Sequence, residues 1–230
     1  GTAWDKNALA AMGSREAPFT NFAEGDFYTA LGTVTKLALL AAWHQKWCVN
    51  TRLRPEVMAG RIHFQETGDR TYGIDPSNNG SNTIAAIKAH NASGTSLLPL
   101  VYPEGSPNHP SYPAGHAVIS GACITIMKAF IDTEGAWPVQ AKHSVNGTDL
   151  VNYTADDADK MTIQGEINKV ASNVATGRNM AGVHYRSDGD MGILLGEMVA
   201  IAYLRDLKES YNENFDGWIL QKLDGTMEII

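Results

Sequence analysis

Apolar residues recur at helical spacing in four long segments of the chain, with polar residues between them. The first segment begins near Asp26, a candidate N-cap, and runs to about Trp47. Its apolar face consists of Leu31, Val34, Leu37, Ala38 and Ala41. Residues 114–131, 162–179 and 187–211 continue the pattern and predict three further long helices.

Shorter elements are expected between and before these segments. We expect a turn of helix over residues 7–12, a helix over 56–63 that a proline opens, and a helix over 83–90. Asn82 or Ser81 is the candidate cap of the last of these.

The end of the chain changes from helical to alternating spacing. Residues 218–223 and 226–230 alternate around Asp224-Gly225, a pair that favours the tight turn of a β-hairpin. The polar connector 132–160 is longer than an ordinary loop, so we expect it to be either functional or packed on another part of the molecule. Together the patterns predict an all-α fold, a helical bundle with a C-terminal β-hairpin.

Composition narrows the classes of function. The chain is 43% hydrophobic and 19% charged, which is ordinary for a globular protein. Its net charge of -7 argues against nucleic acid or an anionic membrane as a partner. Charged residues interrupt the longest apolar runs, which argues against a membrane span. Neither a signal peptide nor a start methionine is visible, so localisation stays unassigned, and we expect residues 1–230 to form a single domain that is a piece of something longer.

Two histidines on either side of a proline-rich turn form the first candidate site. His109 precedes the turn, and His116 falls in the first turn of the predicted helix 114–131. Unpaired N–H groups and a positive dipole end make such a turn favourable for an anion. Gly115 lets a ligand approach the backbone, and His116 can move a proton near neutral pH. The alternative is a helix start with a packed histidine.

Two further clusters lie near predicted helix ends. One pairs Lys46 with Arg54, and the other combines Arg178, His184 and Asp188. If a bundle brings them to one end, three cations match the oxygens of a tetrahedral oxyanion, and Asp188 lies within reach to orient the His184 ring. Each residue also has an ordinary explanation by itself. Lys46 would be a solvated helix end, Arg178 a charge favoured by the dipole at a helix C-terminus, and His184 a core histidine with its hydrogen bonds satisfied.

The spacing of these residues resembles the three-part signature of the vanadium-dependent haloperoxidases. The matching motifs are Lys46-x7-Arg54-Pro55, Pro113-Ala114-Gly115-His116 and Arg178-x5-His184-x3-Asp188. The flanking residues, among them 45–47 and 106–113, are similar to the bromoperoxidases of red algae and cyanobacteria. The resemblance runs from about Phe19 to the terminal hairpin. It implies the helical core that this family shares with type 2 phosphatidic acid phosphatases and bacterial acid phosphatases.

The resemblance implies a role for each matched residue. The vanadate-binding residues would be Lys46, Arg54, Ala114, Gly115, His116, Arg178 and His184, with His184 bound to the metal and Asp188 behind it. His116 would deprotonate hydrogen peroxide, Lys46 would polarise the bound peroxide, and His109 would tune halide use. The implied reaction oxidises bromide and iodide with hydrogen peroxide to a hypohalous acid equivalent that halogenates organic substrates. Vanadium(V) would act in it as a Lewis acid.

The chain departs from the family in two respects. Ala114 stands where the family has serine, so one hydroxyl donor to the anion is absent. Family members are also longer, which implies that this chain is their C-terminal, site-bearing portion or a minimal relative. The algal and cyanobacterial enzymes form homo-oligomers, often dodecamers, so a homo-oligomer is implied here. Some bind structural calcium, for which Glu24 and Asp26 are candidate ligands.

Two other functions stay open on the sequence. One is an acid phosphatase on the same scaffold, in which His184 attacks phosphorus and His116 protonates the leaving group. His109 and the algal-type flanks favour the peroxidase. The other is a noncatalytic anion-binding domain, which Ala114 suggests and the remaining charged residues and histidines oppose. The organic substrate and the use of chloride are not determined by these residues.

Overall fold

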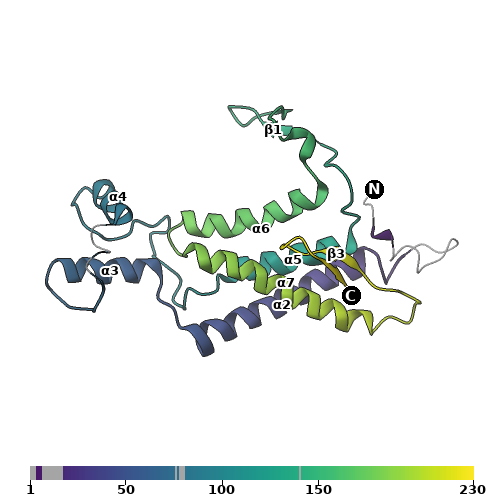
Figure 1. The fold of residues 1–230 in the computed structure, drawn as a ribbon, viewed down its shortest axis with the longest axis horizontal. Coiled ribbons are helices and arrows are strands. Elements are labelled where there is room, and N and C mark those ends of the chain that lie inside the picture. The colour runs from purple at the N-terminus through teal and green to yellow at the C-terminus, as the bar shows by residue number, and fades with distance from the viewer. Residues whose placement is uncertain (1–3, 7–17, 76, 78–80, 140) are drawn as a thin grey trace.

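The computed structural model describes residues 4–6, 18–75, 77, 81–139 and 141–230. Within these ranges four long helices run roughly along the longest axis of the molecule (Figure 1). They are α2 (Glu24–His44), α5 (Gly115–Phe130), α6 (Ile163–Met180) and α7 (Arg186–Lys208). The predicted helical bundle is therefore confirmed. None of the described helices is long and apolar enough to cross a membrane. The helical turn expected over residues 7–12 lies outside the described residues.

Helix α5 lies at the centre of the bundle and contacts α2, α6 and α7. Most of its residues are buried, because they are small or apolar all round the helix. Glycine allows α5 and α7 to approach closely. A Cβ atom on Gly121 would lie 2.2 Å from the carbonyl oxygen of Ile193, and one on Gly196 would lie 2.1 Å from that of Val118.

The helix caps agree only in part with the sequence. Ser81, rather than Asn82, caps α4 (Asn82–His90), since its hydroxyl accepts a hydrogen bond from the amide three residues on. The cap predicted at Asp26 is wrong, because α2 begins two residues earlier. The Asp26 carboxylate instead accepts a hydrogen bond from the Tyr211 hydroxyl at 2.6 Å, which ties the start of α2 to the chain after α7.

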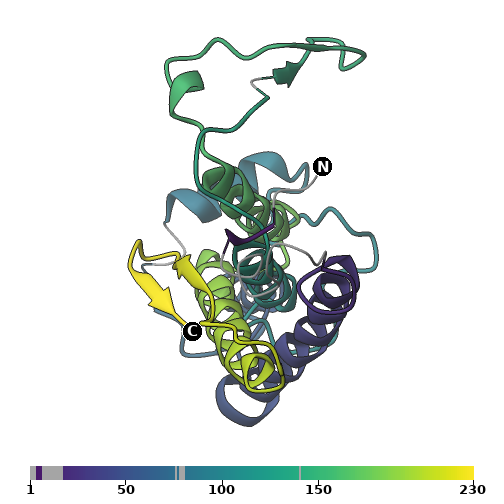
Figure 2. The same ribbon diagram turned by 90° about the vertical axis from the view of Figure 1, so that its right-hand side faces the viewer.

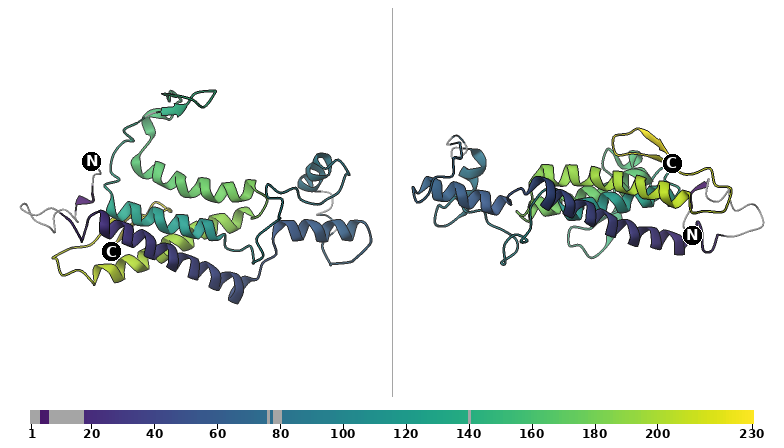
Figure 3. Two further views of the ribbon diagram at one scale, coloured as in Figure 1. Left: turned by 180° about the vertical axis from the view of Figure 1, so that it is seen from behind. Right: turned by 90° about the horizontal axis from the view of Figure 1, so that it is seen from below.

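Helix α2 ends at His44, before the predicted end near Trp47. The chain continues as a π-helical segment, η1 (Gln45–Asn50), which buries the Lys46 side chain completely. Such segments are frequent at functional sites. Helix α3 (Pro55–Glu66) then starts at the predicted proline and projects, with α4, from this end of the bundle (Figure 3).

The predicted C-terminal hairpin is confirmed. Strands β3 (Ile219–Gln221) and β4 (Met227–Ile229) pair antiparallel. Gly225 between them has a φ of 86°, a conformation that glycine adopts without strain. Trp218 and Leu220 are buried in the main core, so the hairpin covers one end of the bundle.

The polar connector contains structure that the sequence pattern did not predict. Strands β1 (Ala141–His143) and β2 (Leu150–Asn152) pair antiparallel, and a short 3-10 helix, η3 (Ala158–Lys160), follows. This arm rises away from the bundle beyond α6 (Figure 2). Its strands are mostly exposed, so their residues do not alternate between apolar and polar, and the sequence pattern does not predict strands here.

Candidate functional site

The predicted site residues gather at the end of the bundle from which α3 projects. Here the C-terminal end of α6 lies beside the N-terminal end of α7 (Figure 1), and Lys46 of η1 contacts the loop that precedes α5. The loop that precedes α5 crosses between these ends and supplies His109. Two helix N-termini add partial positive charge to the cations already present.

Arg54 is the centre of the hydrogen-bond network. Its Nε donates to the His109 carbonyl oxygen at 2.9 Å, and its Nη1 donates to the Val183 carbonyl oxygen at 2.8 Å. Nη1 also lies 2.9 Å from His184 Nε2, and Nη2 lies 3.0 Å from His109 Nδ1. Because a guanidinium only donates, both imidazole nitrogens accept. Burial lowers the pKa of Arg54 to about 10; the Asp188 charge opposes this shift, and the Arg178 charge adds to it. Arg54 therefore stays charged at neutral pH.

The tautomer of His184 is set by two partners. Its Nε2 accepts from Arg54, and its Nδ1 lies 3.0 Å from Asp188 Oδ2, so the proton is on Nδ1 and is donated to the carboxylate. Burial lowers the pKa of His184 although Asp188 opposes this, and the ring is neutral at neutral pH. Burial alone would raise the pKa of Asp188, but hydrogen bonds from His184 and the Tyr185 amide hold it below its ordinary value.

Lys46 reaches from η1 to the loop before α5. Its Nζ donates to the carbonyl oxygens of Pro110 at 2.6 Å and Ser111 at 3.2 Å. Burial and then the Arg54 charge lower the pKa of Lys46 to about 7, although Asp188 acts in the opposite direction. Lys46 therefore changes its charge within the physiological range.

Arg178 approaches the cluster from the last turn of α6. Its Nη1 donates to the Tyr102 hydroxyl at 3.0 Å, and its guanidinium carbon lies 5.4 Å from the centre of the Tyr102 ring. Its Nε is buried and has no hydrogen-bond partner among the described residues. A buried donor without a partner is uncommon in proteins and points to a group that it can bind.

The start of α5 faces these cations. Ala114 is the N-cap residue and provides no side-chain cap, and its amide donates to a carbonyl oxygen of α7. Gly115 and His116 are the first two residues of the helix. The His116 residue is exposed. Burial of part of the ring, and then the charges of Arg178 and Lys46, lower the pKa of His116.

His109 is held between Arg54 and the aromatic ring of Trp43, whose centre lies 5.0 Å away. Burial, and then the charges of Lys46 and Arg54, lower the pKa of His109 to about 4. The ring is therefore neutral and serves as a hydrogen-bond acceptor for Arg54 at neutral pH.

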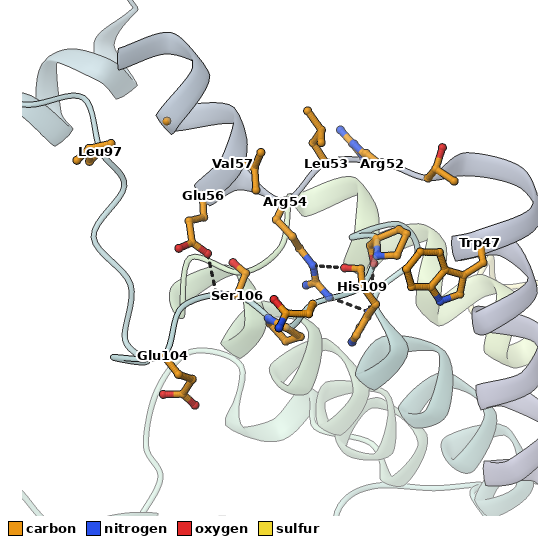
Figure 4. Close-up of a pocket in the computed structure, with 15 residues that line it drawn as sticks. Trp47, Arg52, Leu53, Arg54, Glu56, Val57, Leu97, Glu104, Ser106 and His109 are labelled. Carbon is orange, nitrogen blue, oxygen red and sulfur yellow. Dashed lines mark hydrogen bonds between the residues drawn. The ribbon is translucent and has the colours of Figure 1, made fainter. Parts of the chain in front are cut away.

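A cavity of about 730 Å³ opens beside the cluster (Figure 4). Arg52, Arg54 and His109 line it, whereas His116 and His184 do not. Its apolar wall is formed by Trp47, Leu53, Val57 and Leu97. The cavity is therefore a vestibule on one side of the cations and not the space between them.

The network includes two residues that the sequence did not mark as site residues. Arg52 pairs with Asp188 at 2.9 Å, and Tyr102 contacts Arg178 as described above. The signal for Arg52 was its place two residues before Arg54. No comparable signal exists for Tyr102, because its position depends on the path of a loop with no periodic pattern.

The residues suggested for calcium do not form a compact set. In the described ranges no three His, Cys, Asp or Glu side chains gather closely enough to hold a metal ion. Asp26 is hydrogen-bonded to Tyr211. Calcium binding by Glu24 and Asp26 therefore stays a prediction from the resemblance alone.

Residues 26–213 match the protein family described as the VCPO second helical-bundle domain. The chain belongs to this family. The match includes every residue of the three motifs, from Lys46 to Asp188, and nearly all of the four long helices. The haloperoxidase family that the motifs indicate is thus confirmed.

Individual relatives of this haloperoxidase domain are bromoperoxidases. A vanadium-dependent bromoperoxidase of Ascophyllum nodosum is 36% identical over an alignment of 233 positions, which covers 94% of this chain and 41% of that protein. A vanadium-dependent bromoperoxidase of Corallina pilulifera is 37% identical over an alignment of 227 positions, which covers 90% of this chain and 37% of that protein. The chain therefore spans about two fifths of the length of these relatives.

A solved structure shares the fold of this haloperoxidase domain. It is the homohexameric second vanadate-dependent bromoperoxidase of Ascophyllum nodosum, with a TM-score of 0.80 and 31% sequence identity. The similarity covers 94% of this chain and 41% of that one.

Proposed function

We propose that this chain carries the vanadate site of a bromoperoxidase that oxidises bromide and iodide with hydrogen peroxide and halogenates organic substrates. The observation that carries the proposal is the gathering of Lys46, Arg54 and Arg178 at the start of α5. Asp188, the carboxylate whose charge acts on Lys46 and Arg54, is already paired with Arg52. Uncompensated positive charge at a helix N-terminus favours a tetrahedral oxyanion. The bromoperoxidase relatives support this reaction over hydrolysis of a phosphate ester.

The donors present fit vanadate. The buried Nε of Arg178 lacks a partner among the described residues, and a bound oxyanion would satisfy it. Lys46, Arg54 and the Gly115 amide would hold other oxygens, and His184 Nε2 would be the nitrogen ligand. When bound, vanadate supplies a Lewis-acidic centre that activates hydrogen peroxide toward halide.

The two helix-borne histidines have different tasks in this proposal. His184 keeps its proton on Nδ1, which donates to Asp188, so the lone pair is on Nε2, and a bound oxyanion would replace the hydrogen bond that Nε2 accepts from Arg54. His116 is neutral at neutral pH, accessible and close to the charges of Arg178 and Lys46, so it can take a proton from hydrogen peroxide and return it. His109 acts through its hydrogen bond to Arg54, and we assign it the tuning of halide use.

Halide and the organic substrate need a route to the cluster. The cavity beside Arg54 and His109 provides one, and its apolar wall suits a small organic molecule that is largely uncharged. The route ends at His109 and Arg54, which are hydrogen-bonded to each other. Arg54 also contacts His184, the proposed vanadate ligand.

Bromination of a phenol-type dye by the purified chain with hydrogen peroxide tests the proposal. We expect bromination only after orthovanadate is added, and we expect phosphate to compete with it. Hydrolysis of a phenyl phosphate ester is measured in parallel on the vanadate-free chain. Efficient hydrolysis together with undetectable bromination would replace the proposal by the acid phosphatase alternative.

Two variants separate the roles of the histidines. His184→Ala is expected to abolish tight binding of orthovanadate, because it removes the nitrogen ligand. His116→Ala should leave the ion bound and slow bromination by about 10²–10⁴-fold, the range for a lost general acid–base group. An equal loss of orthovanadate affinity in both variants would contradict this division of tasks.

We also propose that residues 1–230 are the site-bearing C-terminal part of a longer enzyme and that the chain forms a homo-oligomer. Exposed apolar side chains on α2 and η1, namely Leu40, Trp43 and Trp47, support an interface on this face. The homohexameric state of the solved bromoperoxidase is consistent with such an assembly. Sedimentation equilibrium of the chain over a range of concentrations tests this, and a monomer throughout would contradict it.

A further inference from the structure

Arg52 occupies an unspecified position of the first motif, yet it contacts the carboxylate of the site directly. Its Nη1 donates to Asp188 Oδ1 at 2.9 Å and to Ser187 Oγ at 2.8 Å. Its guanidinium carbon lies 4.2 Å from the centre of the Tyr185 ring. The Asp188 side chain is completely buried, whereas 40% of the Arg52 side chain is exposed. Arg52 therefore supplies the counter-charge of Asp188 from the solvent side.

The two oxygens of Asp188 face different partners. Oδ1 accepts from Arg52, and Oδ2 accepts from His184 Nδ1 and from the Tyr185 amide, each at 3.0 Å. A carboxylate held on both oxygens has a fixed plane, so the direction of the His184 ring is fixed as well. Removal of Arg52 would free Oδ1 and leave the buried charge with weaker compensation.

We propose that Arg52 is a positioning residue for the oxyanion site. It holds Asp188 as the acceptor of the His184 Nδ1–H, and it thereby fixes the direction of the Nε2 lone pair, which accepts from Arg54 here and would face an oxyanion that replaces this contact. The inference rests on the proposed function, because that function makes Nε2 the ligand atom. Arg52 itself does not reach the oxyanion and acts through Asp188 and then His184.

The chemistry of this position favours arginine over lysine. One guanidinium can donate to Ser187 and Asp188 while its face lies over the Tyr185 ring. Lysine would preserve the charge but not the flat contact with the ring. We therefore expect Arg52→Lys to have a smaller effect than Arg52→Ala, and the pair of variants distinguishes charge from geometry.

The experiment uses the full chain and two measurements. ¹⁵N NMR of histidine-labelled protein reports the tautomer of His184 without any added ion, and the His184→Ala variant assigns its signals. Calorimetric titration measures the affinity for orthovanadate. Arg186→Ala is the matched control, because Arg186 Nε also pairs with an aspartate at the start of α7, Asp190, at 3.2 Å, while both side chains are mainly exposed.

The wild-type chain and Arg186→Ala should show the Nδ1–H tautomer and equal affinity. Arg52→Ala should shift the His184 Nδ1 signal, because Asp188 then loses its partner on Oδ1, although Arg54 on Nε2 keeps the proton on Nδ1. Arg52→Ala should also bind orthovanadate up to about 10- to 100-fold more weakly, the range for loss of an outer contact of a metal ligand. Arg52→Lys, expected to retain the fold, should lose less affinity. A wild-type His184 Nδ1 signal in Arg52→Ala would overturn the proposal, whatever the affinity of this variant. If the wild-type chain binds no orthovanadate, the proposed function fails, and the Nδ1 signal still decides the role of Arg52.

Discussion

At the scale of single residues, the site lowers the pKa values of its histidines and of Lys46. Burial and the arginine charges lower the pKa values of His109, His116 and His184, so these rings are neutral at neutral pH. Lys46, with a pKa of about 7, is present at neutral pH in both its charged and its neutral form. An oxyanion that enters the cluster would draw a proton onto Lys46, because opposite charges stabilise each other.

Lys46 should make oxyanion binding depend on pH. Sulfate is a suitable probe, since its charge is constant near neutrality. Its affinity should fall as the pH rises above about 7, by at most about tenfold per pH unit for one linked proton. The histidines are already neutral there and should not contribute. Lys46→Met should bind sulfate more weakly with a flat profile, and a flat profile in the wild-type chain would contradict the assignment.

Lys46 also makes the free energy of unfolding depend on pH. The pKa of Lys46 is about 7 in the folded chain, whereas an unfolded lysine keeps its proton up to about pH 10.4. Between these values the unfolded state binds more protons, so the contribution of Lys46 to the free energy of unfolding rises with pH.

Ala114 offers a second test at this scale. A serine hydroxyl at this N-cap position can donate to an oxyanion or accept from a free amide of α5. A hydrogen bond to a charged group contributes about 1.5–3 kcal/mol, so Ala114→Ser should tighten orthovanadate binding by about ten- to a hundredfold. Titration of the vanadate-free chain measures this, with circular dichroism as the control for the fold. Unchanged affinity would mean that the hydroxyl does not reach the anion.

At the scale of elements, the contact between α5 and α7 positions two of the helix ends that form the site. It depends on glycine, because a Cβ on Gly196 would lie 2.1 Å from the Val118 carbonyl oxygen and 2.6 Å from the Ala122 amide nitrogen. Both atoms belong to backbone and cannot move aside independently of the helix. The separation of α5 and α7 is therefore decided by residues that are not themselves part of the anion site.

Gly196→Ala should lower the free energy of unfolding by about 1–3 kcal/mol or more, the range for overpacking a core. Gly32→Ala in α2 is the matched control, since a Cβ there meets nothing within 4 Å. The control should be stabilised by about 0.5–1 kcal/mol, because alanine is the better helix former. Urea unfolding measures both, and equal stability of Gly196→Ala and the wild type would contradict the close approach.

At the scale of the whole molecule, a buried ion pair joins the C-terminal hairpin to the bundle. Lys128 and Glu197 lie 3.4 Å apart, on α5 and α7, with almost no exposure of either side chain. Lys128 Nζ donates to the Gln221 carbonyl oxygen, and Glu197 accepts from the Leu223 amide. Burial lowers the pKa of Lys128, although Glu197 opposes this.

Glu197→Gln should destabilise the fold by about 3–5 kcal/mol at neutral pH, because it leaves the Lys128 charge buried without a partner. Thermal and denaturant unfolding measure the change, and the loss should shrink at high pH as the lysine becomes neutral in both states. Asp190→Asn, which removes an exposed pair with Arg186, should change stability by less than about 1 kcal/mol. A loss no larger than that of the control would show that the pair does not secure the hairpin.

The sequence by itself determined the helices, the hairpin and the three motifs, because helical spacing, Asp-Gly turns and short residue spacings are local properties of a chain. It also marked Lys46, Arg54, His116, Arg178 and His184 as one set, although their roles toward vanadate stay predictions. It did not reveal the paired strands of the connector, whose exposed residues carry no periodic pattern.

The tertiary structure alone decided how the site residues contact one another. The proton position on His184 follows from Arg54 on one nitrogen and Asp188 on the other, and Arg54 lies 130 positions away in the chain. The π-helical turn that buries Lys46 and the pairing of Arg52 with Asp188 depend equally on contacts between distant segments. Periodicity describes which face of an element is apolar, but only packing determines which faces and ends meet.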